Sequence, residues 1–226
     1  MPEAGHGGGP RELALGLWCW TAAHPAWAAG HGWERDVSCY CLLSSDAAVF
    51  VDPLLPESGS WGAYDALAAR QGRPVAIVLS RAGHFRSANE FALRYNATIH
   101  GHASAAEAVD ARVEFRAVGE GDALPGAGVV LNFDVPGLDH TPFYFARQRA
   151  GIPGDILIRA EGGVRLWWAP EDDGDVHFLH ERHIPALRGW LERPIEHVLL
   201  SHGDPVIGDG EAELLAAFSR PTWKIT

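Results

Sequence analysis

Residues 74–87 read PVAIVLSRAGHFRS, and this stretch decides the fold. An apolar run, Val75 to Leu79, ends in Ser80 and is followed by a short turn that carries His84. A helix-like segment begins directly after the turn, at residues 88–95. A buried strand that runs into a sharp turn before a helix is where α/β proteins place functional side chains. The stretch therefore predicts an α/β protein with a candidate site at the end of this strand.

Length and composition favour one globular domain. At 226 residues the chain can bury a large core, and a single domain is its simplest organisation. Hydrophobic residues make up 47% and charged residues 21% of the chain, which is typical of a globular protein. The N-terminus is rich in Gly and Pro, so we expect a flexible tail over residues 1–11 and one domain over residues 12–226.

Charge and cysteine content exclude some partners and favour a compartment. The formal net charge of -11 argues against nucleic acid and anionic membranes as partners. The apolar segment at residues 13–30 is too interrupted to span a bilayer and lacks the basic start of a signal peptide. Cys19, Cys39 and Cys41 have no zinc-type spacing, so we interpret them as buried free thiols. Together these features predict a cytoplasmic protein.

Hydrophobic periodicity predicts the order of the elements. We expect strands at residues 12–20, 37–43, 47–51, 75–79, 98–100, 113–117, 129–135, 143–146, 155–159, 164–168 and 197–200. We expect helices at residues 61–71, 88–95, 184–192 and 211–218, and a helical turn at residues 104–109. Two mixed sheets packed together, with the helices outside, satisfy this order.

The stretch around His84 resembles the metallo-β-lactamase fold family, whose pattern there is His-x-His-x-Asp-His after Leu-Ser or Leu-Thr. With His84 on the second histidine, Ala82, Arg86 and Ser87 stand at the other three ligand positions. The resemblance implies the αβ/βα four-layer sandwich of that family, with two mixed β-sheets flanked by helices, over about residues 13–218.

The expected strand at residues 47–51 ends in Asp52-Pro53. This resembles the early hairpin of the family, which closes on Asp-Pro or Asp-Gly. The resemblance implies a structural role for Asp52, because an aspartate at such a turn bonds backbone N–H groups.

Two later segments resemble ligand motifs of the family. Residues 136–142, PGLDHTP, are similar to its PGHTPG segment, and residues 201–205, SHGDP, are similar to its terminal Gly-His-Gly motif. The resemblance implies His84, His140 and His202 as metal ligands. The reduced set implies one ion at most, zinc or else iron or manganese, or no metal at all. The family's acidic ligand is expected after the strand at residues 164–168, near residues 169–172.

Arg86 stands where the family has an aspartate ligand. A guanidinium cannot be deprotonated and cannot be a ligand. Pointing inward at about 4 Å from a divalent ion, it would be repelled by on the order of 8 kcal/mol at an effective dielectric near 20. Arg86 therefore either turns away or replaces a cation, and in the second case Arg86 and Ser87 bind an anionic ligand group.

Other histidines mimic metal motifs. His100 and His102 form a His-x-His pair, but the family has a structural strand end at that place. His180 and His183 flank Glu181 with one residue fewer than the HExxH motif requires, so they would not share a helix face. We expect the second group to form a solvated segment or the rim of a pocket.

Two functions fit these residues. The first is a metallo-β-lactamase-fold hydrolase with at most one metal ion, a water nucleophile and a small-molecule substrate. The alternative is a non-catalytic protein of this fold that lost its metal site and binds a small anionic ligand or a protein partner, because a fold does not imply a function. The third hypothesis is an unrelated α/β protein whose resemblance to the family motifs arises by chance. The sequence leaves the substrate and the oligomeric state open.

Overall fold

The computed structural model describes residues 9–57, 59–132, 139–168 and 173–223. The first sheet starts antiparallel and continues parallel, since strands β1 to β4 are antiparallel neighbours and β4 to β7 are parallel ones. In spatial order its strands are β1 (Arg11–Ala14), β2 (Leu17–Ala23), β3 (Asp36–Leu43), β4 (Ala48–Val51), β5 (Val75–Val78), β6 (Thr98–Gly101) and β7 (Phe115–Ala117).

The second sheet is also mixed, because β11 and β14 are parallel while the other neighbours are antiparallel. In spatial order its strands are β15 (Val206–Ile207), β14 (His197–Val198), β11 (Ala150–Ile152), β10 (Phe143–Phe145), β9 (Gly128–Val130) and β8 (Ala123–Leu124). A separate antiparallel pair is formed by β12 (Leu157–Ala160) and β13 (Gly163–Leu166).

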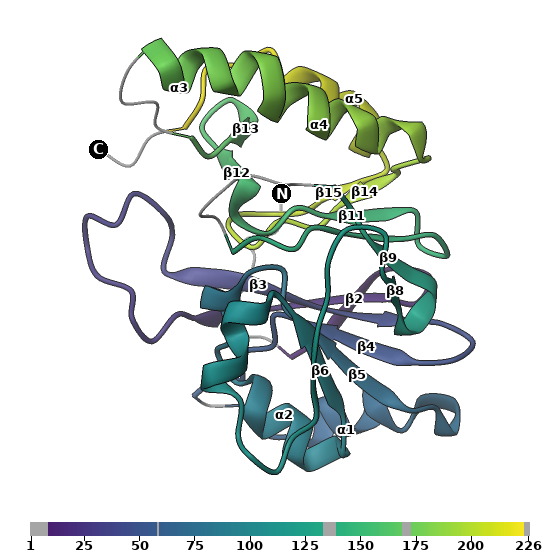
Figure 1. Ribbon diagram of the computed structural model, residues 1–226. Helices are drawn as coiled ribbons and strands as arrows, with labels where there is room; N and C mark the ends of the chain where they lie inside the picture. The colour runs from purple at the N-terminus through teal and green to yellow at the C-terminus, as the bar shows by residue number, and fades with distance from the viewer. Residues whose placement is uncertain (1–8, 58, 133–138, 169–172, 224–226) are drawn as a thin grey trace.

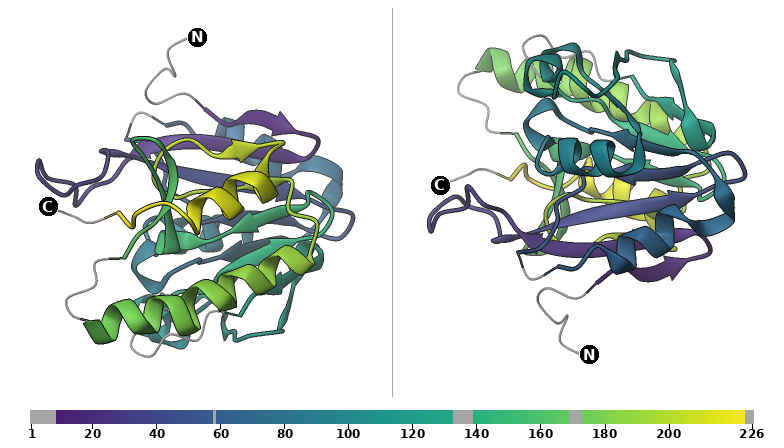
Figure 2. Two further views of the ribbon diagram at one scale, coloured as in Figure 1. Left: turned by 90° about the horizontal axis from the view of Figure 1, so that it is seen from above. Right: turned by 90° about the horizontal axis from the view of Figure 1, so that it is seen from below.

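Helices cover the outer faces of both sheets. The α-helices are α1 (Gly62–Ala68), α2 (Ala88–Tyr95), α3 (Asp173–Phe178), α4 (Ile184–Arg188) and α5 (Gly210–Ala217). Helices α1 and α2 lie under the first sheet, and α3, α4 and α5 lie over the second (Figures 1 and 2). This arrangement confirms the predicted two mixed sheets flanked by helices. Among the described helices, none has the length and apolar character needed to cross a bilayer.

Three hydrophobic clusters separate the four layers. One joins the first sheet to α1 and α2 and contains Trp20, Phe50 and Phe91. The second lies between the sheets, and the third joins the second sheet to α4 and α5. Strand β4 and most of β5 are buried, as expected for parallel strands that are covered on both faces. Their continuous apolar sequences are what made them predictable.

The three cysteines are buried and free, as expected. Cys39 and Cys41 lie in the cluster between the first sheet and its helices, and Cys19 lies between the sheets. Burial raises the pKa of Cys39 to about 11. Because the thiolate is the reactive form of cysteine, we expect Cys39 to be unreactive at neutral pH.

The single strand expected at residues 12–20 is two strands in the structure. Gly16 adopts a positive φ of 72° and turns the chain between β1 and β2, so that Ala14 pairs with Leu17. Leu15 lies at the tip of this hairpin and is 84% exposed. The alternating leucines predicted one continuous strand, and the prediction was wrong because glycine readily adopts the backbone conformation that reverses the chain.

Strand β3 of the first sheet is hydrogen-bonded to the segment that follows β14 of the second sheet. Ser38 N–H donates to the carbonyl of Ser201 at 2.9 Å, and the hydroxyl of Tyr40 donates to the carbonyl of Leu200 at 2.6 Å. These bonds tie the first sheet to the segment after β14. They bring together chain segments that are about 160 residues apart.

Candidate metal centre

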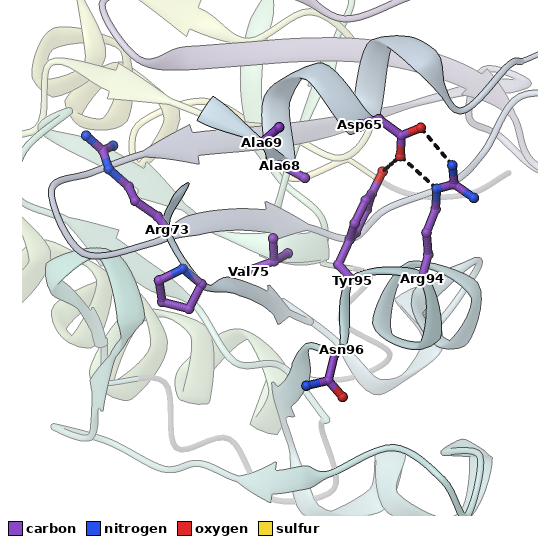
Figure 3. A pocket seen from close by; sticks show the side chains of 9 residues that line it. Asp65, Ala68, Ala69, Arg73, Val75, Arg94, Tyr95 and Asn96 are labelled. Carbon is purple, nitrogen blue, oxygen red and sulfur yellow. Dashed lines mark hydrogen bonds and ion pairs between the residues drawn. The ribbon is translucent and has the colours of Figure 1, made fainter. Parts of the chain in front are cut away.

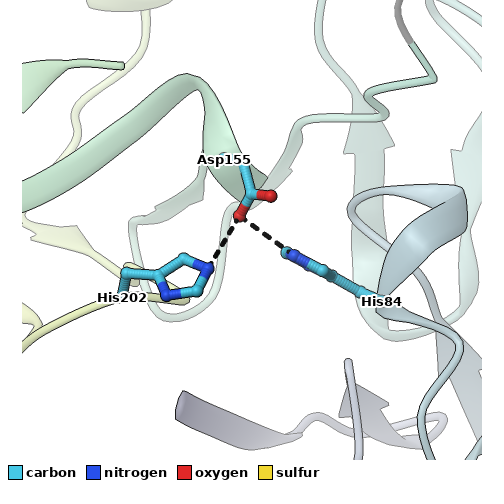
Figure 4. A group of neighbouring side chains, drawn as sticks. All are labelled: His84, Asp155 and His202. Carbon is cyan, nitrogen blue, oxygen red and sulfur yellow. Dashed lines mark ion pairs between the residues drawn. The ribbon is translucent and has the colours of Figure 1, made fainter. Parts of the chain in front are cut away.

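Three buried side chains from three different loops converge at this junction. His84 ends η2 (Ala82–His84), the 3₁₀ turn after β5. Asp155 lies in η5 (Gly154–Ile156), the 3₁₀ turn after β11, and His202 follows β14. One ligand atom from each residue lies within 4.8 Å of the other two, so the group could hold a metal ion. Figure 4 shows the Asp155 carboxylate between the two imidazole rings.

The Oδ1 atom of Asp155 is the centre of this group. It lies 3.0 Å from Nε2 of His84 and 3.3 Å from Nε2 of His202. None of the described residues gives this buried oxygen a hydrogen bond of normal geometry. Its contacts with the two imidazoles are ion-pair contacts, and a metal ion bound between the three ligand atoms would take the place of the imidazole protons.

His84 is oriented from behind by Asp52. Nδ1 of His84 lies 3.0 Å from Oδ2 of Asp52, and Asp52 in turn accepts hydrogen bonds from the main-chain N–H and the hydroxyl of Ser80. Asp52 thus bonds both the backbone of the turn and the imidazole of His84. A carboxylate on Nδ1 keeps that nitrogen protonated and leaves Nε2 as the ligand atom.

Asp155 is oriented by a guanidinium. Nη1 of Arg81 donates to Oδ2 of Asp155 at 2.7 Å, and Nε of Arg81 donates to Oδ1 of Asp139 at 2.9 Å. The side chain of Arg81 is 40% exposed, whereas that of Asp155 is 8% exposed. Arg81 therefore lies at the rim of the site and fixes which oxygen of Asp155 faces the histidines.

Aromatic rings surround His202. The ring centroids of Trp33 and Trp167 lie 4.8 Å and 5.1 Å from that of His202. The backbone is held by an isolated β-bridge to Val37 and by the N–H of Arg159, which donates to the His202 carbonyl at 3.1 Å. This packing fixes the orientation of the His202 ring.

Charge coupling perturbs the pKa values of the group. Burial disfavours the charged form of His84, but Asp155 and Asp52 outweigh it and raise the pKa of His84 to about 9. Burial also opposes ionisation of Asp155, yet His84 and His202 hold its pKa well below the usual range. Burial lowers the pKa of His202. Without a metal ion, His84 is therefore an imidazolium and Asp155 a carboxylate at neutral pH.

This coupling predicts a pH dependence of the metal-free protein. The pKa of His84 rises from 6.5 to about 9 on folding, so its contribution to stability is complete below pH 6.5 and is lost as the pH rises through about 9. Asp155 stays ionised in this range in both states. Between pH 7 and 8.5 we expect the free energy of unfolding to fall with a slope approaching about 1.4 kcal/mol per pH unit. Urea unfolding with a chelator measures the slope, and a flat profile would contradict a protonated His84.

The other residues implied by the resemblance lie beside this group. His140 forms an isolated β-bridge with Arg81 but is not one of the three residues brought together. Arg86 donates through Nη1 to the carbonyls of Ser38 and Asp52. Ser87 accepts a hydrogen bond from the N–H of Leu55. These bonds of Arg86 and Ser87 join parts of the protein itself, so a role of the two residues in ligand binding stays a prediction.

Sequence reasoning missed Asp155. The acidic ligand was expected near residues 169–172, which lie outside the described residues, and Asp155 was taken as the start of a strand. In the structure β11 ends at Ile152, and Pro153-Gly154-Asp155 forms the turn that follows. Gly154 has a φ of 60°, and a Cβ there would lie 2.9 Å from the carbonyl oxygen of Ser80. The Gly-Asp pair after an apolar strand was the available signal.

A groove of about 280 Å³ opens beside His202. Its lining includes Trp33, Trp223, Glu34 and Arg159. A second hollow of about 410 Å³ shares Glu34 and Arg159 with it, so the two are adjacent. Of the three-residue group, His202 lines the groove.

Another cavity, of about 650 Å³, lies between α1, α2 and the start of β5. Its carboxylate, Asp65, is already engaged by Arg94 through two bonds of 2.7 Å and by the hydroxyl of Tyr95 at 3.1 Å (Figure 3). The residues that line it include none of the three that form the metal-binding group. Asp65 and Arg94 are therefore suitable positions for control variants.

Comparison with known proteins shows similarity in structure alone. No family model and no curated protein matches the sequence. The flavodiiron protein of Giardia intestinalis is similar with a TM-score of 0.63 and 17% identity over 93% of this chain, which spans 58% of that protein's length. The DIM-1 metallo-β-lactamase exposed to ceftazidime is similar with a TM-score of 0.63 and 12% identity, over 93% of this chain and 95% of that one.

A metallo-β-lactamase family protein from Thermus thermophilus is also similar, with a TM-score of 0.57 and 18% identity over 92% of this chain and 80% of that one. At these identities the likeness is one of fold, two mixed sheets flanked by helices. The chain therefore has the metallo-β-lactamase fold.

Proposed function

We propose that the protein is a hydrolase that uses one metal ion, bound by His84, Asp155 and His202. The observation that carries the proposal is the convergence of three buried ligand atoms: Oδ1 of Asp155 lies 3.0 Å from Nε2 of His84 and 3.3 Å from Nε2 of His202. His84 and His202 keep the roles implied by the sequence. Asp155 supplies the acidic ligand in place of residues 169–172, and His140 is not part of the proposed set.

The donor set suits zinc. Two imidazoles and one carboxylate are the protein ligands of several catalytic zinc sites, in which the fourth position holds water. The same set with open positions also binds Fe(II), so iron is the competing ion. A metal ion here would supply Lewis acidity, which lowers the pKa of bound water and polarises a carbonyl group.

The surrounding residues hold the ligand atoms in place. Asp52 fixes the tautomer of His84, and Arg81 leaves only Oδ1 of Asp155 facing the histidines. Such outer partners typically account for about 10- to 100-fold in metal affinity. Trp33 and Trp167 pack against the ring of His202 and hold its orientation. Esters, thioesters and lactams are the substrates to test first, because their carbonyl groups respond to this chemistry.

One observation favours the alternative, a non-catalytic protein that binds a ligand or a partner. His84 and Asp155 already neutralise each other across 3.0 Å, and the raised pKa of His84, about 9, keeps it protonated at pH 7. An imidazolium has no lone pair for a metal. A metal ion must therefore displace the His84 proton, and its affinity must exceed this cost.

Metal content separates the two functions. We expect the purified, untagged protein to contain about one zinc or iron ion per chain, measured by elemental analysis. His202→Ala should lose the ion, because it removes one of three ligands. His102→Ala is the matched control and should keep it, since His102 lies outside the group and caps a turn through Ser104.

Turnover completes the test. If metal content follows this pattern, hydrolysis of an ester, thioester or lactam by the wild type but not by His202→Ala supports the proposal. If both proteins lack metal even after dialysis against zinc, iron and manganese, the hydrolase proposal fails. The alternative would then be tested with anionic ligands.

A further inference from the structure

The two oxygens of Asp155 are divided between different partners. Oδ1 faces the imidazoles of His84 and His202. Oδ2 accepts a hydrogen bond of 2.7 Å from Nη1 of Arg81. A carboxylate can bridge two cations, one near each side. In this chain one of those sides is already occupied by a guanidinium.

Arg81 is held firmly in that position. Its Nε donates to Oδ1 of Asp139 at 2.9 Å, and the N–H of Gly83 donates to the other oxygen of Asp139 at 3.3 Å. The main chain of Arg81 also forms a β-bridge with His140. The guanidinium therefore joins two carboxylates from loops that are 58 and 74 residues away in the sequence.

We propose that Arg81 limits the site to a single metal ion, because its guanidinium occupies the position beside Asp155 where a second ion would bind. This inference rests on the proposed function, since it concerns the same site. A guanidinium stays charged at every pH at which the protein folds. A second divalent ion near Oδ2 would meet this charge at short range in a partly buried site, where screening by solvent is weak.

Removing the charge should create a second site. Without Arg81, the carboxylates of Asp139 and Asp155 would lose the cation that both of them bond, and their mutual repulsion would no longer be offset there. A divalent ion relieves the repulsion. His140 lies on the segment that is bridged to residue 81 and is the candidate for a third donor.

The test is the number of metal ions per chain after equilibrium dialysis against zinc, with Co²⁺ absorption as a second readout. We expect one ion in the wild type and two in Arg81→Met, which keeps much of the side-chain volume but not the charge. Arg81→Lys keeps the charge and should bind one ion. Arg94→Ala removes a surface cation from Asp65, outside the site, and should also bind one.

The outcomes distinguish this inference from the proposed function. One ion in both the wild type and a folded Arg81→Met, as judged by circular dichroism, would overturn the inference alone. Two ions in the wild type would also overturn it. No ion in the wild type but one in Arg81→Met would support a metal-blocking role of Arg81 and reject the proposed hydrolase. No ion in any variant would reject both.

Discussion

Asp155→Asn is expected to weaken zinc binding by more than about 100-fold, because loss of an outer partner alone typically costs about 10- to 100-fold and Asp155 is itself a ligand. The substitution keeps the shape of the side chain but removes the charge that faces both imidazoles. Competition with a chromophoric chelator measures the change in affinity. Hydrolytic activity should fall in parallel.

Asp139→Asn is the matched control for this experiment. Asp139 also bonds Arg81, but it is not among the three residues that could hold the ion. Because Asp139 acts on Asp155 only through Arg81, we expect Asp139→Asn to weaken zinc binding much less than Asp155→Asn does. Unchanged affinity in Asp155→Asn would show that the ligand set is wrong. His140, implied by the sequence, would then be the next residue to replace.

Asp52→Ala is expected to destabilise the metal-free protein by about 3–5 kcal/mol, the range typical of removing one partner from a buried charged network. Asp52 is 2% exposed. Burial opposes its ionisation, but His84 and Arg86 outweigh this and lower its pKa. Its loss leaves the N–H and hydroxyl of Ser80 and Nδ1 of His84 without their carboxylate partner. Guanidinium chloride unfolding measures the effect.

Two variants test the origin of this destabilisation. Asp52→Asn keeps hydrogen-bonding groups at the same place and should lose less stability than Asp52→Ala. Asp65→Ala removes a carboxylate from an exposed pair with Arg94, and we expect a much smaller loss because surface ion pairs contribute little. Equal losses in Asp52→Ala and Asp65→Ala would argue against a buried network around Asp52.

The sequence predicted two of the three residues of the site, His84 and His202. Each lies in a short loop a few residues after an apolar strand, in a sequence motif that can be recognised without the fold. Asp155 was missed because the strand before it, β11, is only three residues long. A periodic pattern needs more residues than that to be recognised. Asp155 was therefore taken as the start of a later strand, at residues 155–159.

Arg86 and Arg81 show a second limit. The position of Arg86 in the turn predicted either a guanidinium turned away or one that replaces a cation. In the structure Arg86 bonds main-chain carbonyls, and Arg81 is the guanidinium that contacts Asp155. Arg86 has a positive φ of 42°, a backbone conformation that the sequence does not reveal. Side-chain direction in a tight turn depends on such angles.

The sequence by itself determined the order of strands and helices, the two mixed sheets, and the placement of His84 and His202 after buried strands. These features are local, because hydrophobic periodicity and turn residues act over a few neighbouring positions. Only the tertiary structure decided that Asp155 joins the two histidines and that Arg81 binds its second oxygen. That arrangement depends on the close approach of Gly154 to Ser80 and on bonds between residues 74 positions apart, and periodicity carries no information about such pairs.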